Sequence, residues 1–296
     1  MKIIDILNRR ATLSFEIFPP KKQNGDISSI YQTVERLARL QPDFISVTYG
    51  AMGTSSDNTV EIASKIKHDY QIESVAHLTC VGADETKIKK NLDALKAAGI
   101  ENVLALRGDY PADYNPQDSL QHFTYASDLS AYIKANYGEQ FCVSGACYPE
   151  VHYEADNLDA DLKALKAKVD AGCDYLVTQV FFDNDYYYRL IREARKRGIN
   201  VPIIAGIMPA VNPKSLKNIA KVSGCTIPYR LSAMIERFAH NPQAMREVGM
   251  QYAAFQILDL ITNGVDGIHI YTMNKPDIAE EILSKMQYIK DEFKDN

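Results

Sequence analysis

The chain lacks several features that would assign it to a common functional class. It has no tryptophan, and its five cysteines include no Cys-x-x-Cys pair and no grouping with histidine. We therefore expect reduced core thiols in a cytoplasmic protein, without a zinc site. No apolar run approaches the roughly 20 residues of a membrane-spanning helix, and charges interrupt the N-terminus too early for a signal peptide. A formal net charge of -5 argues against a nucleic-acid-binding surface.

A dinucleotide-binding glycine motif is also missing. No Gly-x-Gly-x-x-Gly follows the first predicted strand, where an open, doubly wound nucleotide-binding fold would carry it. The length of 296 residues instead suits one α/β barrel, typically about 250 residues. Because there is no linker or low-complexity segment, residues 1–296 are expected to form a single barrel domain.

From Thr12 onward, short apolar runs alternate with amphipathic helical stretches. The predicted strands are residues 12–18, 43–49, 74–80, 102–107, 141–148, 175–181, 201–208 and 266–271. Helices are predicted at residues 27–40, 58–70, 85–98, 158–171, 185–197 and 213–222. Two more are predicted to begin near residue 127 and at residue 276, and an extra helical pair is predicted at roughly 228–239 and 242–263. This alternation, with strands apolar on both faces, predicts a parallel sheet closed into a (β/α)8 TIM barrel. An open doubly wound sheet is the alternative.

The first predicted strand carries an acidic residue. Glu16 stands in the otherwise apolar run before Pro19 and Pro20, which cannot donate to a strand ladder and end it. A carboxylate buried at that point must be paired, neutral or functional, because burying it alone is expensive. The residues of this strand leave both a salt-bridged core glutamate and a functional acid open.

Polar side chains follow nearly every predicted strand, and in a barrel these strand ends form one mouth. Arg107 offers planar donors for phosphate, although an ordinary ion pair would explain it equally well. His77 fits either a satisfied core histidine or a site residue. Asp161 and Lys168 are about two helical turns apart, so both are expected on one face of the helix. They could form a solvated ion pair, or they could contact a ribose and a pyrophosphate.

Eight segments, in order, closely resemble methylenetetrahydrofolate reductases. They are Ser14–Pro20, Val47–Ala51, His77–Cys80, Leu106–Asp109, Tyr125–Asp128, Tyr148–His152, Thr178–Gln179 with Phe181–Asp183, and His269–Asn274. The resemblance runs from about Leu13 to Lys275 and is to the short bacterial form.

The resemblance implies a flavoprotein oxidoreductase of one-carbon metabolism. In this family FAD at the barrel mouth is reduced by NAD(P)H and passes a hydride to 5,10-methylenetetrahydrofolate, in ping-pong fashion. The product, 5-methyltetrahydrofolate, feeds methionine synthesis. A cytoplasmic homo-oligomer with no metal, nucleic-acid or membrane partner is expected.

By position, the resemblance makes Glu16 the general acid that assists opening of the folate's five-membered ring, and it sets Asp109 between flavin and folate. Gln179, Tyr271 and Lys275 would contact substrate. The FAD-contacting positions would be Thr48, Tyr49, Ala51, His77, Arg107, Gly108, Asp109, Tyr125, Ala126, Tyr148, His152, Ala155, Asp161 and Lys168.

Three positions depart from the family pattern. Lys275 stands where arginine is common, so a point charge replaces a bidentate fork. Ala164 and Ala167 stand where better-known bacterial members have Asn and Arg toward FAD, which predicts weaker retention. Ile219 replaces an aromatic that stacks on the nicotinamide cofactor, which leaves the preference for NADH or NADPH open. The rival classes are a non-flavin aldolase or lyase barrel and an inactive folate- or flavin-binding protein.

Overall fold

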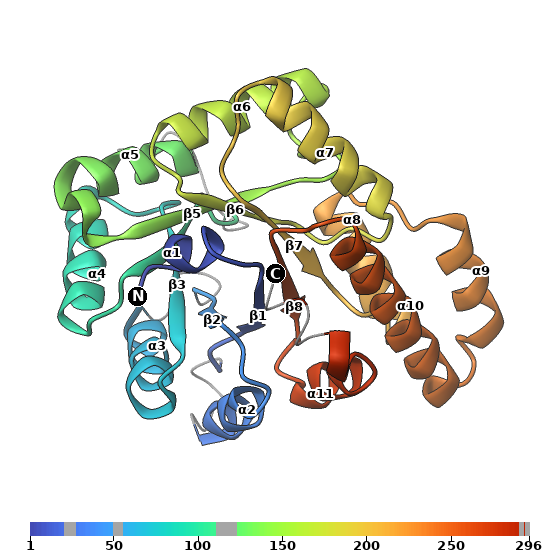
Figure 1. Cartoon of the computed structure of the whole chain (residues 1–296). Helices are drawn as coiled ribbons and strands as arrows, with labels where there is room; N and C mark the ends of the chain where they lie inside the picture. The colour runs from blue at the N-terminus through green and yellow to red at the C-terminus, as the bar shows by residue number, and fades with distance from the viewer. Residues whose placement is uncertain (21–27, 50–55, 111–122, 290–292, 294–296) are drawn as a thin grey trace.

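Eight parallel strands close into a barrel in strictly sequential order, as the alternation predicts. The structure, a computed structural model, describes residues 1–20, 28–49, 56–110, 123–289 and 293 (Figure 1). The strands are β1 (Thr12–Ile17), β2 (Phe44–Val47), β3 (Glu73–Thr79), β4 (Asn102–Leu106), β5 (Cys142–Cys147), β6 (Tyr175–Thr178), β7 (Ile203–Ile207) and β8 (Gly267–Tyr271). Closure pairs β1 with both β2 and β8 and excludes the open-sheet alternative.

Helices surround the barrel at the predicted places (Figure 1). They are α2 (Ser28–Ala38), α3 (Ser56–Tyr70), α4 (Glu85–Ala97), α5 (Ala126–Tyr137), α6 (Leu158–Asp170), α7 (Asn184–Lys196), α8 (Pro213–Ser223), α9 (Tyr229–Phe238), α10 (Pro242–Thr262) and α11 (Pro276–Ser284). The extra pair α9 and α10 precedes β8, as predicted. Two short elements were not predicted: α1 (Ile3–Leu7) and the 3-10 turn η2 (Gly138–Gln140).

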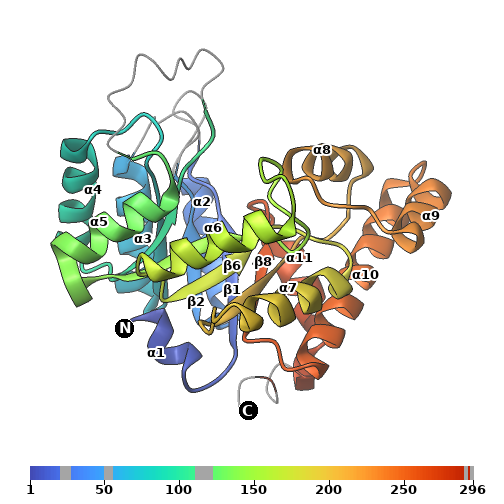
Figure 2. The same cartoon turned by 90° about the horizontal axis from the view of Figure 1, so that it is seen from above.

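Helix α1 closes the end of the barrel opposite α8 (Figure 2). Its Ile3 is fully buried in a cluster of inward-facing residues from the strand starts, which includes Phe44, Val75, Leu104 and Tyr175. Because this apolar layer fills the lower interior, a ligand can enter only from the opposite end, where the strands finish.

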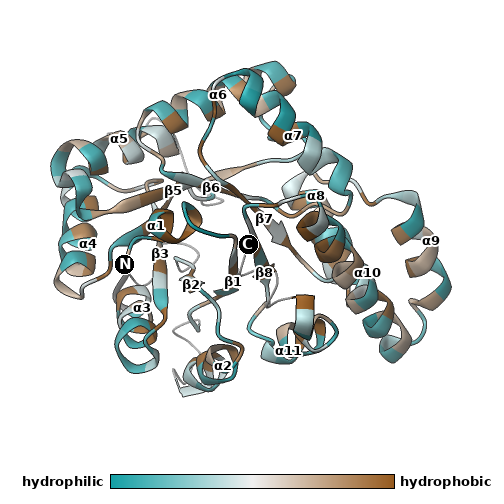
Figure 3. Cartoon of the chain, viewed as in Figure 1, coloured by the Kyte–Doolittle hydropathy of each residue, from teal (hydrophilic) through white to brown (hydrophobic). Residues whose placement is uncertain are grey.

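Above that layer the barrel interior becomes polar. Ser14, Ser46, His77, Ser144 and His269 are all buried at its middle level. Their strand neighbours Leu13, Phe15, Ile45, Ala76 and Ile268 alternate outward into the apolar core beneath the helices. Figure 3 shows the corresponding division, with hydrophilic colour on the outer helix faces and hydrophobic colour toward the strands. Buried polar groups need partners, so this level has a specific hydrogen-bonding arrangement.

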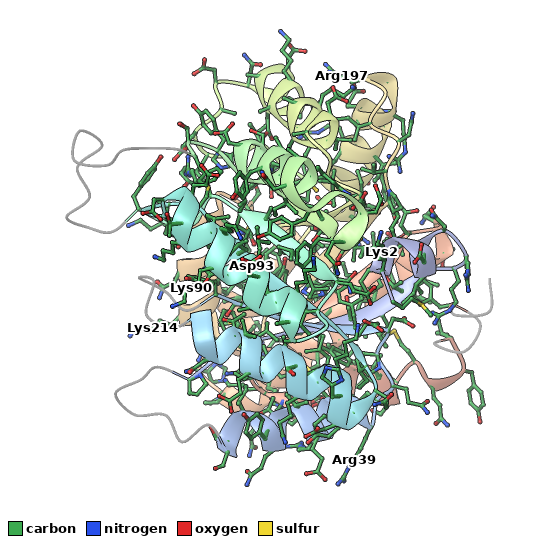
Figure 4. The ribbon with its side chains drawn as sticks, turned by 90° about the vertical axis from the view of Figure 1, so that its left-hand side faces the viewer. Lys2, Arg39, Lys90, Asp93, Arg197 and Lys214 are labelled. Atoms are coloured by element: carbon green, nitrogen blue, oxygen red, sulfur yellow. The ribbon has the colours of Figure 1, made fainter. Side chains whose placement is uncertain are left out.

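The exterior is charged. Lys90 and Asp93 on α4 and Lys214 on α8 are exposed, and Figure 4 shows their side chains pointing away from the barrel. Exposed ion pairs such as Lys89–Asp93 are worth little stability. Within the part of the chain that the structure describes, no helix combines the length and apolar character needed to cross a membrane. All five cysteines are buried and unbridged.

Candidate active site at the carboxyl ends of the strands

Glu16 lies at the upper end of β1 with its side chain inside the barrel and 8% of its surface exposed. Two imidazoles approach the same carboxyl oxygen. His77 Nε2 from β3 lies 3.6 Å from Glu16 Oε2, and His269 Nε2 from β8 lies 3.9 Å from it. Glu16 is therefore a buried carboxyl between two histidines from strands on either side.

Burial lowers the pKa of His77 from 6.5 to about 4, although the Glu16 carboxyl opposes the shift. His77 is consequently neutral at pH 7 and forms no full ion pair with Glu16. Its Nε2 is buried and has no hydrogen-bond partner among the described residues. An unpartnered ring nitrogen beside a carboxyl can accept a proton or donate one without leaving the site.

Tyr271 crosses the mouth beside Glu16. Its hydroxyl reaches over β7 and donates to the Thr178 carbonyl at 2.7 Å. This path requires glycine at 206, because a Cβ there would lie 2.6 Å from the Tyr271 ring and 2.4 Å from the Thr178 carbonyl oxygen. The ring thus covers one side of the polar interior and fixes the end of β6.

The ends of β1 and β8 are joined above Glu16. The Asn274 amide accepts from Phe18 N and donates to Phe18 O, both at 2.8 Å. Thr272 donates to the Glu16 carbonyl at 2.8 Å. Asn274 has a φ of 58°, a left-handed conformation that asparagine tolerates better than most residues. This turn holds the backbone that carries Glu16 against the backbone that carries Tyr271.

A second group of predicted residues gathers at the ends of β4 and β5. The Arg107 guanidinium makes a two-pronged ion pair with Glu154, at 2.5 and 2.8 Å, and lies over the Tyr110 ring. The hydrogen bond from Arg107 lowers the pKa of Glu154. The ion pair that the sequence left open for Arg107 is thus present, and it holds the guanidinium at the barrel mouth. Gly108, at φ 88°, leaves no space for a Cβ against Val81 and Thr79.

Asp161 and Lys168 both face inward from α6, but they do not form the solvated ion pair. Asp161 accepts from the His152 backbone N–H at 3.0 Å, and burial raises the pKa of its carboxyl. Lys168 donates to the Ala146 carbonyl at 2.6 Å, with its chain passing over Gly145. The His152 ring lies edge-on to Tyr148 at 4.5 Å, and burial raises the pKa of Tyr148 to about 12. These contacts bring Asp161, His152 and Tyr148 together, and Lys168 is held beside them against β5.

The remaining predicted residues that the structure describes lie toward the same end of the barrel. Thr48 is buried, and its carbonyl accepts from Thr59. Gln179 turns its side-chain oxygen back to the Val180 N–H. The others range from Ala126, nearly buried at the start of α5, through the half-buried Tyr49 and Ala155 to the exposed Asp109, Tyr125 and Lys275. Ala51 falls outside the described residues.

Comparison with known proteins agrees with this architecture. The family model for methylenetetrahydrofolate reductase matches residues 2–287. The chain belongs to this family. A 5,10-methylenetetrahydrofolate reductase from Pectobacterium carotovorum is 35% identical, and the alignment covers 93% of this chain and 90% of that one.

Longer relatives also match. A methylenetetrahydrofolate reductase (NADH) from Arabidopsis thaliana is 36% identical over 98% of this chain, which spans only 51% of the plant protein. Among solved structures, a Clostridium thermocellum protein that binds two copies of 5-methyltetrahydrofolic acid superposes with a TM-score of 0.65 at 18% identity, covering 96% of this chain and 98% of that one. That likeness confirms the fold.

Sequence reasoning on this methylenetetrahydrofolate reductase family member missed several residues in the barrel interior and at the mouth. Ser14 and His269 stand inside quoted segments but were given no role, and Glu154 was not singled out. Strand alternation could have indicated Ser14, because Ser14 and Glu16 point to the same side of β1. The contact between Arg107 and Glu154 joins residues 47 positions apart, and no local pattern signals it.

Proposed function

We propose that the protein reduces 5,10-methylenetetrahydrofolate to 5-methyltetrahydrofolate with NAD(P)H, in a ping-pong reaction through bound FAD. The product would feed methionine synthesis. One observation carries the proposal: a buried carboxyl, Glu16, stands at the open end of a barrel whose other end is packed with apolar side chains. Family membership supplies the reaction class.

The residues at the ends of β4 and β5 suit FAD. Arg107 and Lys168 carry positive charge for a pyrophosphate, and the half-buried Tyr148 and His152 offer ring surfaces. The exposed Tyr125 adds a further aromatic face at the start of α5. Bound FAD would supply the hydride chemistry, which no side chain can perform.

The protein's own residues would bind, orient and protonate. Glu16 would donate a proton to the folate amine, for which a carboxyl shielded from water is suited. Tyr271 and Gln179 would hold the pterin, and Lys275, exposed at the start of α11, would meet the glutamate tail. Asp109 would place negative charge near the flavin ring. We further expect a homo-oligomer, which light scattering on the purified protein tests.

The test is Glu16→Gln, assayed in two half-reactions. We expect a yellow, folded variant that oxidises NAD(P)H at the wild-type rate but reduces the folate about 10²–10⁴-fold more slowly, the usual worth of a general acid. Glu139→Gln is a suitable control, because Glu139 lies in η2 near α1, away from the mouth, and pairs with Lys2.

Two outcomes would overturn the proposal. A colourless wild-type protein that does not take up added FAD would show that FAD is not its cofactor. If Glu16→Gln kept more than about a tenth of the wild-type folate activity, Glu16 would not be the general acid.

A further inference from the structure

The segment between β5 and α6 lies across the Arg107 side chain. The Glu154 carboxyl takes both terminal nitrogens of the guanidinium, with Oε2 2.5 Å from Nη1 and Oε1 2.8 Å from Nη2. The Tyr153 hydroxyl accepts a further hydrogen bond from Nη2 at 3.3 Å. The forked edge of Arg107, which is the edge that binds an anion through two hydrogen bonds, is therefore occupied by a residue of the chain itself.

Arg107 is the fixed member of this pair. Its side chain is 16% exposed, and its backbone carbonyl accepts from the Val81 N–H at 2.8 Å, which holds the end of β4 against the segment that follows β3. The Glu154 side chain is 43% exposed, so its carboxyl can turn into water without uncovering the core. The hydrogen bond to Glu154 raises the pKa of Arg107, which stays charged whichever anion it holds.

The start of the same segment is anchored by contacts that do not involve the guanidinium. The Glu150 carboxyl accepts from the Thr226 N–H and hydroxyl at 2.7 and 2.5 Å, and the His152 N–H donates to Asp161 at 3.0 Å. The Glu154 N–H donates to His152 Nδ1 at 3.1 Å. Release of the Glu154 carboxyl therefore requires only a rotation of its side chain, and the backbone of the segment can stay where it is.

The charges at the mouth favour such a release. A pyrophosphate carries two negative charges, and the cations proposed to meet them are Arg107 and Lys168. While Glu154 is paired with Arg107, its carboxylate cancels one of these two positive charges and takes the place of a phosphate oxygen. Two anions on one guanidinium edge repel each other strongly. Carboxylate and phosphate are thus alternatives for Arg107.

We propose that Glu154 is a displaceable carboxylate that competes with the FAD pyrophosphate for Arg107 and thereby sets how tightly the cofactor is held. The inference rests on the proposed function, in which FAD binds at the ends of β4 and β5. Since Glu154 opposes cofactor binding, a neutral residue of the same shape at this position should strengthen it.

The test is Glu154→Gln, measured as the affinity of the apoprotein for FAD by the change in flavin fluorescence. Glutamine keeps the shape of the side chain and one acceptor oxygen but loses the charge. The ion pair no longer has to be broken and no negative charge remains beside the phosphate, so we expect FAD to bind about tenfold more tightly. Riboflavin, which has the same ring but no phosphate, should bind both proteins equally. This comparison separates competition for a phosphate from a general loosening of the mouth.

Two further variants provide matched controls. Glu150→Gln makes the same change in the same segment, but the Glu150 carboxyl contacts Thr226, so the affinity for FAD should not rise. In an Arg107→Gln background, Glu154→Gln should give no gain, because the group for which carboxylate and phosphate compete is absent.

A second measurement needs no flavin. Nitrogen-15 NMR of the arginine side chains should show the Arg107 signals shifting on addition of inorganic pyrophosphate, at a lower concentration in Glu154→Gln than in the wild type. Glu154→Gln protein that binds FAD no more tightly than the wild type, or a gain that is equally large for riboflavin or in Glu150→Gln, would overturn the inference. Failure of the wild type to bind FAD would instead overturn the proposed function, and the pyrophosphate titration would still decide whether Glu154 competes for Arg107.

Discussion

At the scale of single residues, a structural role for a polar side chain does not rule out the functional role proposed for it. His77 is buried, as a core histidine would be, but its Nε2 has no hydrogen-bond partner among the described residues and faces Glu16. Arg107 is an ion-pair partner, and Glu154 holds its guanidinium where a phosphate would be bound. These structural roles agree with the proposed functional ones, because the groups that a ligand uses must be held in place before it arrives.

The buried His77 predicts a pH dependence of stability. Its pKa is about 4 in the folded protein and near 6.5 when unfolded, so between these values the unfolded chain binds the extra proton. Stability is then fully present above about pH 6.5, falls as the pH drops toward 4, and levels off below. The full loss is about 3 kcal/mol.

In urea unfolding, His77→Gln should reduce the difference in stability between about pH 7 and about pH 4.5 by roughly 2 kcal/mol. His240→Gln, at an exposed position after α9, provides the comparison and should leave the difference unchanged. An identical pH dependence in wild type and His77→Gln would mean that His77 titrates normally in the folded state.

At the scale of elements, the hydrophobic periodicity predicted the strands and helices whose formation depends on local sequence. The alternating apolar runs predict all eight strands and the long helices. Where the observed boundaries differ from the predicted ones, they differ by one to three residues, mainly because polar residues at the predicted strand ends do not pair with the neighbouring strand. Helix α1 was missed because its five residues are too short to show a helical period. The Ser14–His269 contact was missed because it joins residues 255 positions apart, which only barrel closure brings together.

The turn after β8 gives a prediction at this scale. Asn274→Gly keeps the left-handed backbone but removes both hydrogen bonds to Phe18, so backbone strain does not contribute to the result. We expect a loss of about 1–3 kcal/mol in unfolding free energy. Folate reduction should fall as well, since the end of β1 that carries Glu16 is released.

The neighbouring residue supplies the control. Met273 also has a left-handed backbone, with φ 53°, and its side chain is 46% exposed. Met273→Gly should be neutral or slightly stabilising because it relieves strain without removing a contact of the turn. If both glycine variants unfold at the same denaturant concentration, the Asn274 amide does not hold the two strands together.

At the scale of the whole molecule, the barrel separates stability from chemistry. The apolar lower interior and α1 close one end, while the polar groups gather at the other, as the layering of a (β/α)8 barrel requires. FAD would bind across the mouth, from Arg107 at the end of β4 to Lys168 on α6. Its binding would therefore tie the end of β4 to helix α6, so that cofactor binding and global stability are linked.

The last prediction concerns this linkage. Ala164 and Ala167 are exposed on α6, next to the inward-facing Asp161 and Lys168, and neither alanine can donate a hydrogen bond. Each charge-assisted hydrogen bond is worth roughly 1.5–3 kcal/mol, so two fewer would weaken FAD binding by orders of magnitude. We expect activity to fall on dilution to nanomolar protein and to return with added FAD, and the melting temperature to rise with FAD concentration. Ala167→Arg should restore part of the retention, whereas Ala160→Arg, at the start of α6, should not. Wild-type protein that remains fully active and yellow at nanomolar concentration without added FAD would show that other contacts hold the cofactor.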